Sequence, residues 1–326
     1  MRAVLCKEYG PPESLVVESV DDPVAKSGQA VIDVAACAIN FPDVLAIEGK
    51  YQFKPPMPFS PGAEVSGIIS DVGSGVENVA VGDAVFASPG FGGLAEKVVV
   101  NAESCVPVPD GIDLVHASAF MYAYGTSQHA LVDRGHIQPG ESLVVLGAAG
   151  GVGLAAVELG ELLGARVIAA ASTEEKLALC REYGASETIN YVEEDLKKRM
   201  RDLTGGLGAD VVYDAVGGPY AEPALRSMAW NGRYLVVGFA AGDIPKIPLN
   251  LLLLKGCQAV GVFWGAFVAR EPERHKANVE QLMTWWSEGK LRPHVSKTYP
   301  LEHAGEAIRL LADRGALGKV VVTIPE

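Results

Sequence analysis

The sequence predicts an α/β protein in which a doubly wound parallel sheet is inserted into a β-rich domain. Three observations predict this class. Short β-like runs separated by Gly and Pro fill the first 110 residues, continuous apolar runs alternate with helical patterns from residue 142, and a helical segment with one last strand ends the chain. Short strands between turn residues favour a barrel-like β domain. Unbroken apolar strands alternating with helices favour βαβ units.

The first domain is predicted from four short runs and the turns between them. Gly10-Pro11-Pro12, Pro55-Pro56 and Ser60-Pro61-Gly62 are typical turn sequences. The expected strands are residues 29–34, 65–72, 84–87 and 97–100. A helix is expected from Asp113 to about Arg134.

The inserted sheet is predicted from six apolar runs, which is the number of strands in a full dinucleotide-binding sheet. The runs are residues 143–146, 167–170, 188–190, 211–213, 234–237 and 259–263. Helical patterns at residues 279–286 and 304–311 and a strand at 319–324 follow. This last piece is too short to bury a core of its own, so we expect it to rejoin the first domain. The predicted domains are residues 1–122 with 265–326, and residues 123–264.

Composition limits the classes of function. The chain has 326 residues, 49% hydrophobic and 21% charged, as in an ordinary globular enzyme. A net charge of −13 without a large basic block argues against a nucleic-acid partner. Five scattered cysteines suit reduced thiols, and the N-terminus turns polar too early for a signal peptide. The apolar stretch at residues 143–164 contains Glu158 and Glu161, so we expect no membrane span and a cytoplasmic protein.

The strongest local motif is a glycine-dense turn between a strand and a helix, Gly147-Ala148-Ala149-Gly150-Gly151-Val152-Gly153. Glycines there let the backbone approach a pyrophosphate, and the helix N-terminus offers N–H groups to it. The order strand, turn, helix predicts dinucleotide binding by Gly150, Gly151 and Val152. A tight turn without a ligand is the alternative.

The adenosine end of this site predicts NADPH. NAD-binding units carry Asp or Glu about 20 residues past the glycines, but here Ser172 stands 19 residues after Gly153. Ser172, with Lys176 one helical turn on, suits a 2′-phosphate. Alternatively, Ser172 and Glu175 form a capping box and Lys176 is plain surface.

With these motifs the chain resembles the medium-chain dehydrogenase/reductase superfamily, specifically its zinc-free quinone oxidoreductase (zeta-crystallin-like) branch. The resemblance covers almost the whole chain, and its specific stretches are Ala38-Ile39-Asn40-Phe41-Pro42-Asp43, Pro61-Gly62-Ala63-Glu64-Val65-Ser66-Gly67, the glycine turn, Ser172-Thr173-Glu174-Glu175-Lys176 and Ile189-Asn190-Tyr191. It implies a Rossmann domain inserted in a GroES-like catalytic domain, and it adds Tyr191 to the residues expected at the cofactor.

The resemblance also implies that no metal is bound. The zinc enzymes of the superfamily hold their catalytic metal with Cys, His and Cys, and the aligned positions are Asn40, Ala63 and Tyr122. Without zinc, alcohol oxidation lacks its Lewis acid. Quinones and α,β-unsaturated carbonyls delocalise the charge that develops on hydride addition, so a few neutral hydrogen bonds suffice.

Asn40 and Tyr51 are the expected donors to the substrate, and the resemblance places both near the nicotinamide. A loop cap for Asn40 and a rim aromatic for Tyr51 remain alternatives. Asp43 and Glu64 are expected to be structural, since such residues often accept backbone N–H groups. Leu45 stands where quinone reductases of the family often have a second tyrosine, which leaves the quinone open.

Ligands of doubly wound sheets bind beyond the carboxyl ends of the strands. We therefore expect Thr126, Gly238, Phe239, Phe263 and Trp264 around the nicotinamide, and a small-molecule substrate in the cleft between the domains. The last strand of the sheet should be an edge strand, and an open apolar edge favours a homodimer. Two alternatives remain: an enoyl- or acryloyl-CoA-type reductase of the same fold, and a low-turnover NADPH-binding sensor or RNA-binding protein.

Overall fold

The computed structural model describes residues 1–325, and it divides the chain into two compact units. The first unit comprises residues 1–122 and the chain from residue 293 onward, and the second comprises residues 123–292. Each unit has its own sheet, which confirms the predicted α/β class with an inserted parallel sheet. Among residues 1–325, no helix is both long and apolar enough to cross a membrane.

The first unit is built on a seven-stranded sheet in which segments from both ends of the chain pair. The strand order is β14-β15-β3-β4-β5-β7, and β6 also pairs with β3. The strands are β3 (Gln29–Ile39), β4 (Glu64–Val72), β5 (Ala84–Ala87), β6 (Lys97–Asn101), β7 (Val106–Pro107), β14 (Val295–Pro300) and β15 (Lys319–Thr323). Val321 of β15 faces Ala38 of β3 in antiparallel register, so the C-terminal piece rejoins the first unit as expected.

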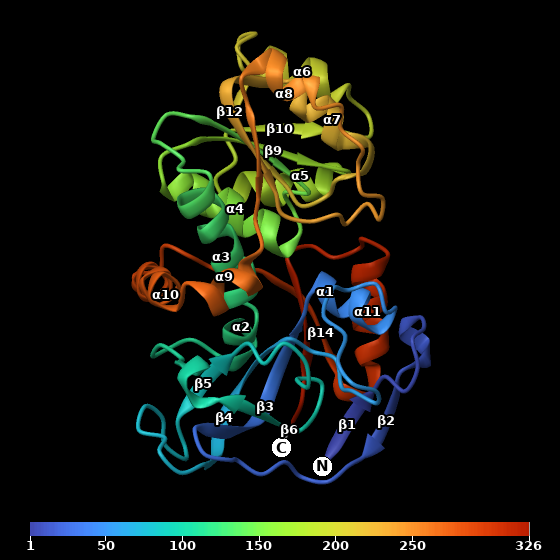
Figure 1. The fold of residues 1–326 in the computed structure, drawn as a ribbon, viewed down its shortest axis with the longest axis vertical. Coiled ribbons are helices and arrows are strands. Elements are labelled where there is room, and N and C mark those ends of the chain that lie inside the picture. The colour runs from blue at the N-terminus through green and yellow to red at the C-terminus, as the bar shows by residue number, and fades with distance from the viewer. Residues whose placement is uncertain (326) are drawn as a thin grey trace. The chain divides into compact units, whose positions relative to one another are not determined.

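Short helices and a two-stranded sheet complete this unit. They are β1 (Arg2–Leu5), β2 (Val16–Ser19), α1 (Phe41–Ile47), α2 (Leu114–Ser118), α11 (Ala304–Ala312) and the 3₁₀ turns η1 (Pro12–Ser14), η2 (Ala102–Ser104) and η5 (Leu301–His303). In Figure 1 the red helix α11 lies beside the blue helix α1, although more than 250 residues separate them in sequence.

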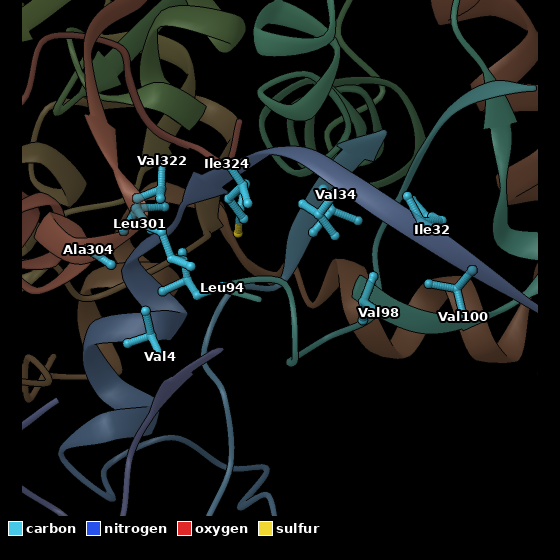
Figure 2. Packing of buried hydrophobic residues seen from close by; sticks show 14 of the residues in the cluster. Val4, Ile32, Val34, Leu94, Val98, Val100, Leu301, Ala304, Val322 and Ile324 are labelled. Atoms are coloured by element: carbon cyan, nitrogen blue, oxygen red, sulfur yellow. The ribbon is translucent and has the colours of Figure 1, made fainter. Parts of the chain in front are cut away.

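The core of the first unit draws apolar side chains from residues 4–105 and from residues 299–324. Figure 2 shows Val4, Ile32, Leu94 and Val322 in one buried cluster. Burying a side chain of this size stabilises a fold by about 1.5–3 kcal/mol relative to exposure. This packing explains why β15, at the end of the chain, pairs with β3 in the first unit.

The second unit contains an entirely parallel six-stranded sheet of order β10-β9-β8-β11-β12-β13. The strands are β8 (Ser142–Leu146), β9 (Arg166–Ala171), β10 (Glu187–Asn190), β11 (Ala209–Asp214), β12 (Met228–Val236) and β13 (Gln258–Gly261). The helices are α3 (Met121–Gln128, which begins in the first unit), α4 (Gly151–Leu162), α5 (Glu174–Glu182), α6 (Leu196–Leu203), α7 (Ala221–Leu225), α8 (Asn250–Lys255), α9 (Trp264–Arg270) and α10 (Pro272–Ser287), with the 3₁₀ turn η4 (Gly218–Tyr220) and the π-helix η3 (His129–Arg134). The edge position predicted for the last strand is confirmed.

β3 and the helix expected at residues 113–134 differ from their predicted limits. β3 continues five residues past Val34, through an alanine-rich stretch, because β4 and β15 pair with it there. The single helix expected at residues 113–134 is divided into α2, α3 and the π-helix η3. Gly135 N–H donates to the carbonyl of Ala130, five residues earlier, which closes the π-type turn.

The division into units keeps α9 and α10 with the second unit, whereas the sequence-based limit assigned residues 265–326 to the first domain. The reason is packing. Phe267 of α9 stacks on His129 with ring centroids 3.9 Å apart, and Asn278 of α10 donates to the buried carboxylate of Asp133 at 2.7 Å. These contacts anchor α9 and α10 to η3.

Candidate functional site

The glycine turn joins β8 to α4 in the second unit. Gly147 has a left-handed φ of +70°, and a Cβ on Gly153 would lie 2.2 Å from the carbonyl oxygen of Gly147. The first intrahelical bond of α4 is donated by Leu154 to Gly150, 2.8 Å long. The N–H groups of Gly151 and Val152 precede that bond and have no carbonyl one turn earlier. The turn thus has the shape and the donors that a phosphate needs.

Ser172 and Lys176 lie together directly beyond the carboxyl end of β9. Lys176 Nζ donates to Ser172 Oγ at 3.3 Å. The residue that caps α5 is Thr173, whose hydroxyl accepts from the N–H of Lys176, so the capping-box alternative for Ser172 is wrong. Arg181 pairs with Glu174 and offsets part of the nearby negative charge. A hydroxyl and an ammonium side by side form a suitable recognition pair for a phosphate monoester.

Tyr191 follows β10, and its ring lies 4.3 Å from the ring of Tyr220, centroid to centroid. Both tyrosines line a pocket of about 620 Å³ on the second unit. Lys197, Arg226 and Lys246 also line it, with Arg226 paired to Glu222 at 2.7 Å.

The residues expected around the nicotinamide gather at the carboxyl ends of β11, β12 and β13. Gly238 and Phe239 follow β12, and a Cβ on Gly217 would lie 2.9 Å from the Phe239 ring. Phe263 is 57% exposed, whereas Trp264 is buried, with its indole 3.0 Å from where a Gly125 Cβ would lie.

Thr126 is brought to the same edge by its neighbour Ser127. The hydroxyl of Ser127 donates to the carbonyl of Val152 at 2.8 Å and lies 3.0 Å from the hydroxyl of Tyr213. These bonds join α3 to the first turn of α4 and to β11. All the residues expected around the nicotinamide therefore lie on the side of the parallel sheet where its strands have their carboxyl ends.

Asp214 orders the loop that follows β11 at this edge. Its carboxylate accepts the N–H groups of Val216 and Gly217, each at 2.8 Å, and the hydroxyl of Tyr234. Burial raises the pKa of the Asp214 carboxyl, against these three hydrogen bonds. The loop is thus held by one buried acid.

In the first unit, Asn40 belongs to a buried polar cluster with Asp43, Glu64 and Lys319. Lys319 Nζ donates to Asn40 Oδ1 at 2.6 Å and to Glu64 Oε2 at 2.8 Å. The amide nitrogen of Asn40 donates to Glu64 Oε2 at 3.1 Å and to the carbonyl of Ala38 at 3.3 Å. Both groups of the Asn40 amide are therefore engaged within the protein.

The two acids of this cluster also hold backbone N–H groups. Asp43 accepts from Asn40 N–H at 2.8 Å and from Gly62 N–H at 3.0 Å, and Glu64 accepts from Tyr122 N–H at 2.8 Å. Burial raises the pKa of the Asp43 carboxyl to about 6, while its two N–H donors and the Lys319 charge act to lower it. This bonding agrees with the structural role expected for Asp43 and Glu64.

Tyr51 lies just after α1, half-buried, with its N–H 3.2 Å from the carbonyl of Leu45. Burial raises the pKa of the Tyr51 phenol, and the charge of Asp43 adds to the effect. Burial likewise raises the pKa of Tyr122, with contributions from Asp43 and Tyr51. Both phenols therefore stay protonated near neutral pH and can act as hydrogen-bond donors.

The positions aligned with zinc ligands do not fit a zinc ion. Ala63 offers no donor atom, and the amide oxygen of Asn40 already accepts from the Lys319 ammonium, a cation that would repel a metal. Among residues 1–325, no group of three or more His, Cys, Asp and Glu side chains is placed to hold a metal ion.

Lys319 is the residue of this cluster that sequence reasoning missed. The sequence predicts the strand at residues 319–324 but indicates no role for its first residue. The available signal was a lysine directly before a run of valines that pairs inside a sheet. Lysines are almost never fully buried unless they are paired, and this one is 4% exposed.

Comparisons with known proteins cover both units. The model of the alcohol dehydrogenase GroES-like domain matches residues 26–110, and that of the zinc-binding dehydrogenases matches residues 151–285. The quinone oxidoreductase-like protein 2 homolog of Nematostella vectensis is 40% identical over 98% of this chain and 88% of its own length. The Escherichia coli quinone oxidoreductase complexed with NADPH superimposes with a TM-score of 0.92, at 27% identity over 99% of this chain and 100% of that chain. An NAD-dependent alcohol dehydrogenase gives a TM-score of 0.91 at 31% identity, with all of both chains covered.

Proposed function

The chain belongs to the zinc-free quinone oxidoreductase branch of the medium-chain dehydrogenase/reductase superfamily, and we propose that it is an NADPH-dependent reductase of quinones or α,β-unsaturated carbonyls. The observation that carries the proposal is the chemistry of the positions aligned with zinc ligands. They hold an amide bonded to an ammonium, an alanine and a tyrosine, so the protein offers neutral donors in place of a Lewis acid. Acceptors that delocalise their own developing charge suit such a site.

NADPH is favoured over NADH by the pair at the end of β9. Lys176 Nζ lies 3.3 Å from Ser172 Oγ, at the place where an NAD-binding unit has a carboxylate. The quinone oxidoreductase of E. coli was solved with NADPH, whereas a structure of nearly equal similarity is an NAD-dependent enzyme. The fold alone therefore does not choose the cofactor, and the proposal depends on these two side chains.

The roles proposed for the residues follow from their bonding. The nicotinamide, when bound, supplies a hydride to the conjugated acceptor, and solvent supplies the proton that completes the two-electron reduction. Tyr51 donates a hydrogen bond to the carbonyl oxygen of the substrate, since its raised pKa keeps the phenol protonated. Asn40 serves the same oxygen by exchanging its longer bond, 3.3 Å, to the carbonyl of Ala38.

We also propose that two copies of the chain associate along β13. Around this edge strand, exposed apolar side chains include Trp230 and Leu253, which are 70% and 79% exposed. An apolar edge strand tends to pair with another strand. Light scattering at micromolar concentration should show a dimer, and Leu253→Asp should shift it toward monomer.

The test of the proposed activity is a substrate panel followed by paired variants. NADPH oxidation is measured with quinones, enones and acyl-CoA esters, which separates the proposed activity from a CoA-ester reductase. Asn40→Ala with Tyr51→Phe should lower kcat by roughly 10- to 1000-fold and leave the Kd for NADPH unchanged. Tyr299→Phe, which removes a hydroxyl outside the cluster, is the matched control. A kcat/KM within about twofold of the wild type would show that neither side chain stabilises the transition state.

A further inference from the structure

Lys319 is a buried lysine at the start of a strand of valines. Within the described chain it is the one lysine or arginine among the buried residues. It opens β15, where Val320, Val321 and Val322 are also buried. Replacing a buried ion pair by apolar side chains is often neutral or stabilising, so stability alone does not account for this lysine.

The bonds of Lys319 fix the orientation of one side-chain amide. An asparagine amide can rotate by half a turn, which exchanges its oxygen and its NH₂ group. Here the ammonium of Lys319 faces the oxygen of Asn40 at 2.6 Å, and the carboxylate of Glu64 faces its nitrogen at 3.1 Å. Rotation would bring NH₂ against an ammonium and oxygen against a carboxylate. One orientation alone satisfies both charges.

The same cluster joins chain segments that are far apart in sequence. Glu64 holds Lys319 with one oxygen and Tyr122 N–H with the other, and Asp43 holds Asn40 N–H and Gly62 N–H. The segments so joined carry Asn40, Ala63 and Tyr122, which are the positions aligned with the metal ligands of the zinc enzymes. In this protein, hydrogen bonds to buried charges connect the backbone segments that a metal ion connects in the zinc enzymes.

We propose that Lys319 is a positioning residue of the reductase, which fixes the Asn40 amide and the segments around it for contact with the substrate. The proposal depends on the proposed function, in which Asn40 and Tyr51 touch the substrate. Lys319 acts through Asn40 and Glu64 and has no direct contact with the reacting atoms in this role. It therefore affects the chemical step and leaves nucleotide binding, which belongs to the second unit, unchanged.

The kinetic test compares Lys319→Met with a variant in which no buried charge is left unpaired. Lys319→Met alone leaves Glu64 buried without its cation and can fail to fold. Lys319→Met with Glu64→Gln removes both charges and keeps an acceptor for Tyr122 N–H. In this double variant kcat should fall 10- to 100-fold while the Kd for NADPH stays within twofold. Lys319→Arg should recover part of kcat, because a guanidinium can donate to the same two oxygens.

Lys297→Met, a change of an exposed lysine on the neighbouring strand β14, is the matched control and should leave kcat unchanged. A double variant with kcat within twofold of the wild type would overturn the proposal. It would show that Lys319 only compensates the charge of Glu64.

A second readout does not depend on turnover. In the nucleotide-free protein, the Asn40 side-chain NH₂ signals should exchange with water at least 10-fold faster in the double variant than in the wild type, as measured by NMR. Unchanged exchange would show that the Lys319–Glu64 pair does not fix the amide. If the wild type reduces no compound of the panel, the proposed function fails. The exchange measurement then still decides whether Lys319, with Glu64, holds the Asn40 amide.

Discussion

The glycine turn of the second unit and the polar cluster around Lys319 in the first unit present polar groups in different ways. The turn uses backbone N–H groups and the absence of Cβ atoms, so its property is a shape within seven consecutive residues. The cluster uses side chains of four residues spread from position 40 to position 319. We therefore expect the turn to be sensitive to added side-chain volume, and the cluster to a change of charge or protonation.

The largest effect is expected from added side-chain volume in the glycine turn. Gly153→Ala should lower the free energy of unfolding by about 3 kcal/mol, because its Cβ would lie 2.2 Å from a backbone oxygen that no rotamer can move. Gly150→Ala meets its nearest atom at 3.4 Å and should cost less than about 1 kcal/mol, yet it should weaken NADPH binding. Urea unfolding and fluorescence titration measure the two properties. Equal stability of the two variants would contradict this account of the turn.

The next effect tests protonation in the cluster. The folded-state pKa of Asp43 is raised to about 6 from 3.8, so the folded protein holds this proton more tightly than the unfolded chain. The stabilisation from Asp43 is therefore fully present below about pH 4 and is lost as the pH rises through 6, a change of about 2–3 kcal/mol. Charged and titratable groups that face Asp43 are Cys37, Tyr51, Glu64, Tyr122 and Lys319.

Asp43→Asn should remove this part of the pH dependence of the unfolding free energy. It should also lower the stability by an amount that does not vary with pH, because an amide is a weaker acceptor for the two N–H groups. The measurement is the difference in unfolding free energy between wild type and variant at several values of pH. Asp21→Asn, at an exposed position of the same unit, is the control. A difference that does not vary between pH 4 and pH 6.5 would show that Asp43 does not titrate in this range.

The smallest effect tests a side-chain contact next to the turn. Lys176→Ala should weaken the binding of NADPH by about 1–2 kcal/mol, the size of an exposed charge-assisted contact, and leave the binding of NADH nearly unchanged. Lys290→Ala, an exposed lysine paired with Glu288, should change neither Kd. Equal losses for NADPH and NADH would refute recognition of the 2′-phosphate by Lys176.

Much of this molecule could be predicted from the sequence because the signals are local. The six parallel strands appear as apolar runs, and the glycine turn stands between one such run and a helix. The carboxyl ends of β11, β12 and β13 bring Gly238, Phe239 and Phe263 to one edge, as the general topology of such sheets requires. The roles proposed for these residues in binding remain predictions.

The differences arise where long-range packing outweighs local preference. The alanine-rich continuation of β3 is a weak strand sequence that becomes a strand because it is paired on both sides. Helices α9 and α10 follow the sheet in sequence and stay with it through His129 and Asp133. No periodicity in residues 265–292 could indicate those partners.

The fold class and the glycine turn could be predicted from residue types at short spacing, whereas the positions aligned with zinc ligands came from the resemblance to the family. The contacts of Lys319 Nζ with Asn40 Oδ1 at 2.6 Å and Glu64 Oε2 at 2.8 Å depend on long-range strand pairing. A lysine before three valines has the same local sequence whether its ammonium is exposed or buried. The antiparallel pairing of β15 with β3 carries this lysine from the end of the chain to Asn40.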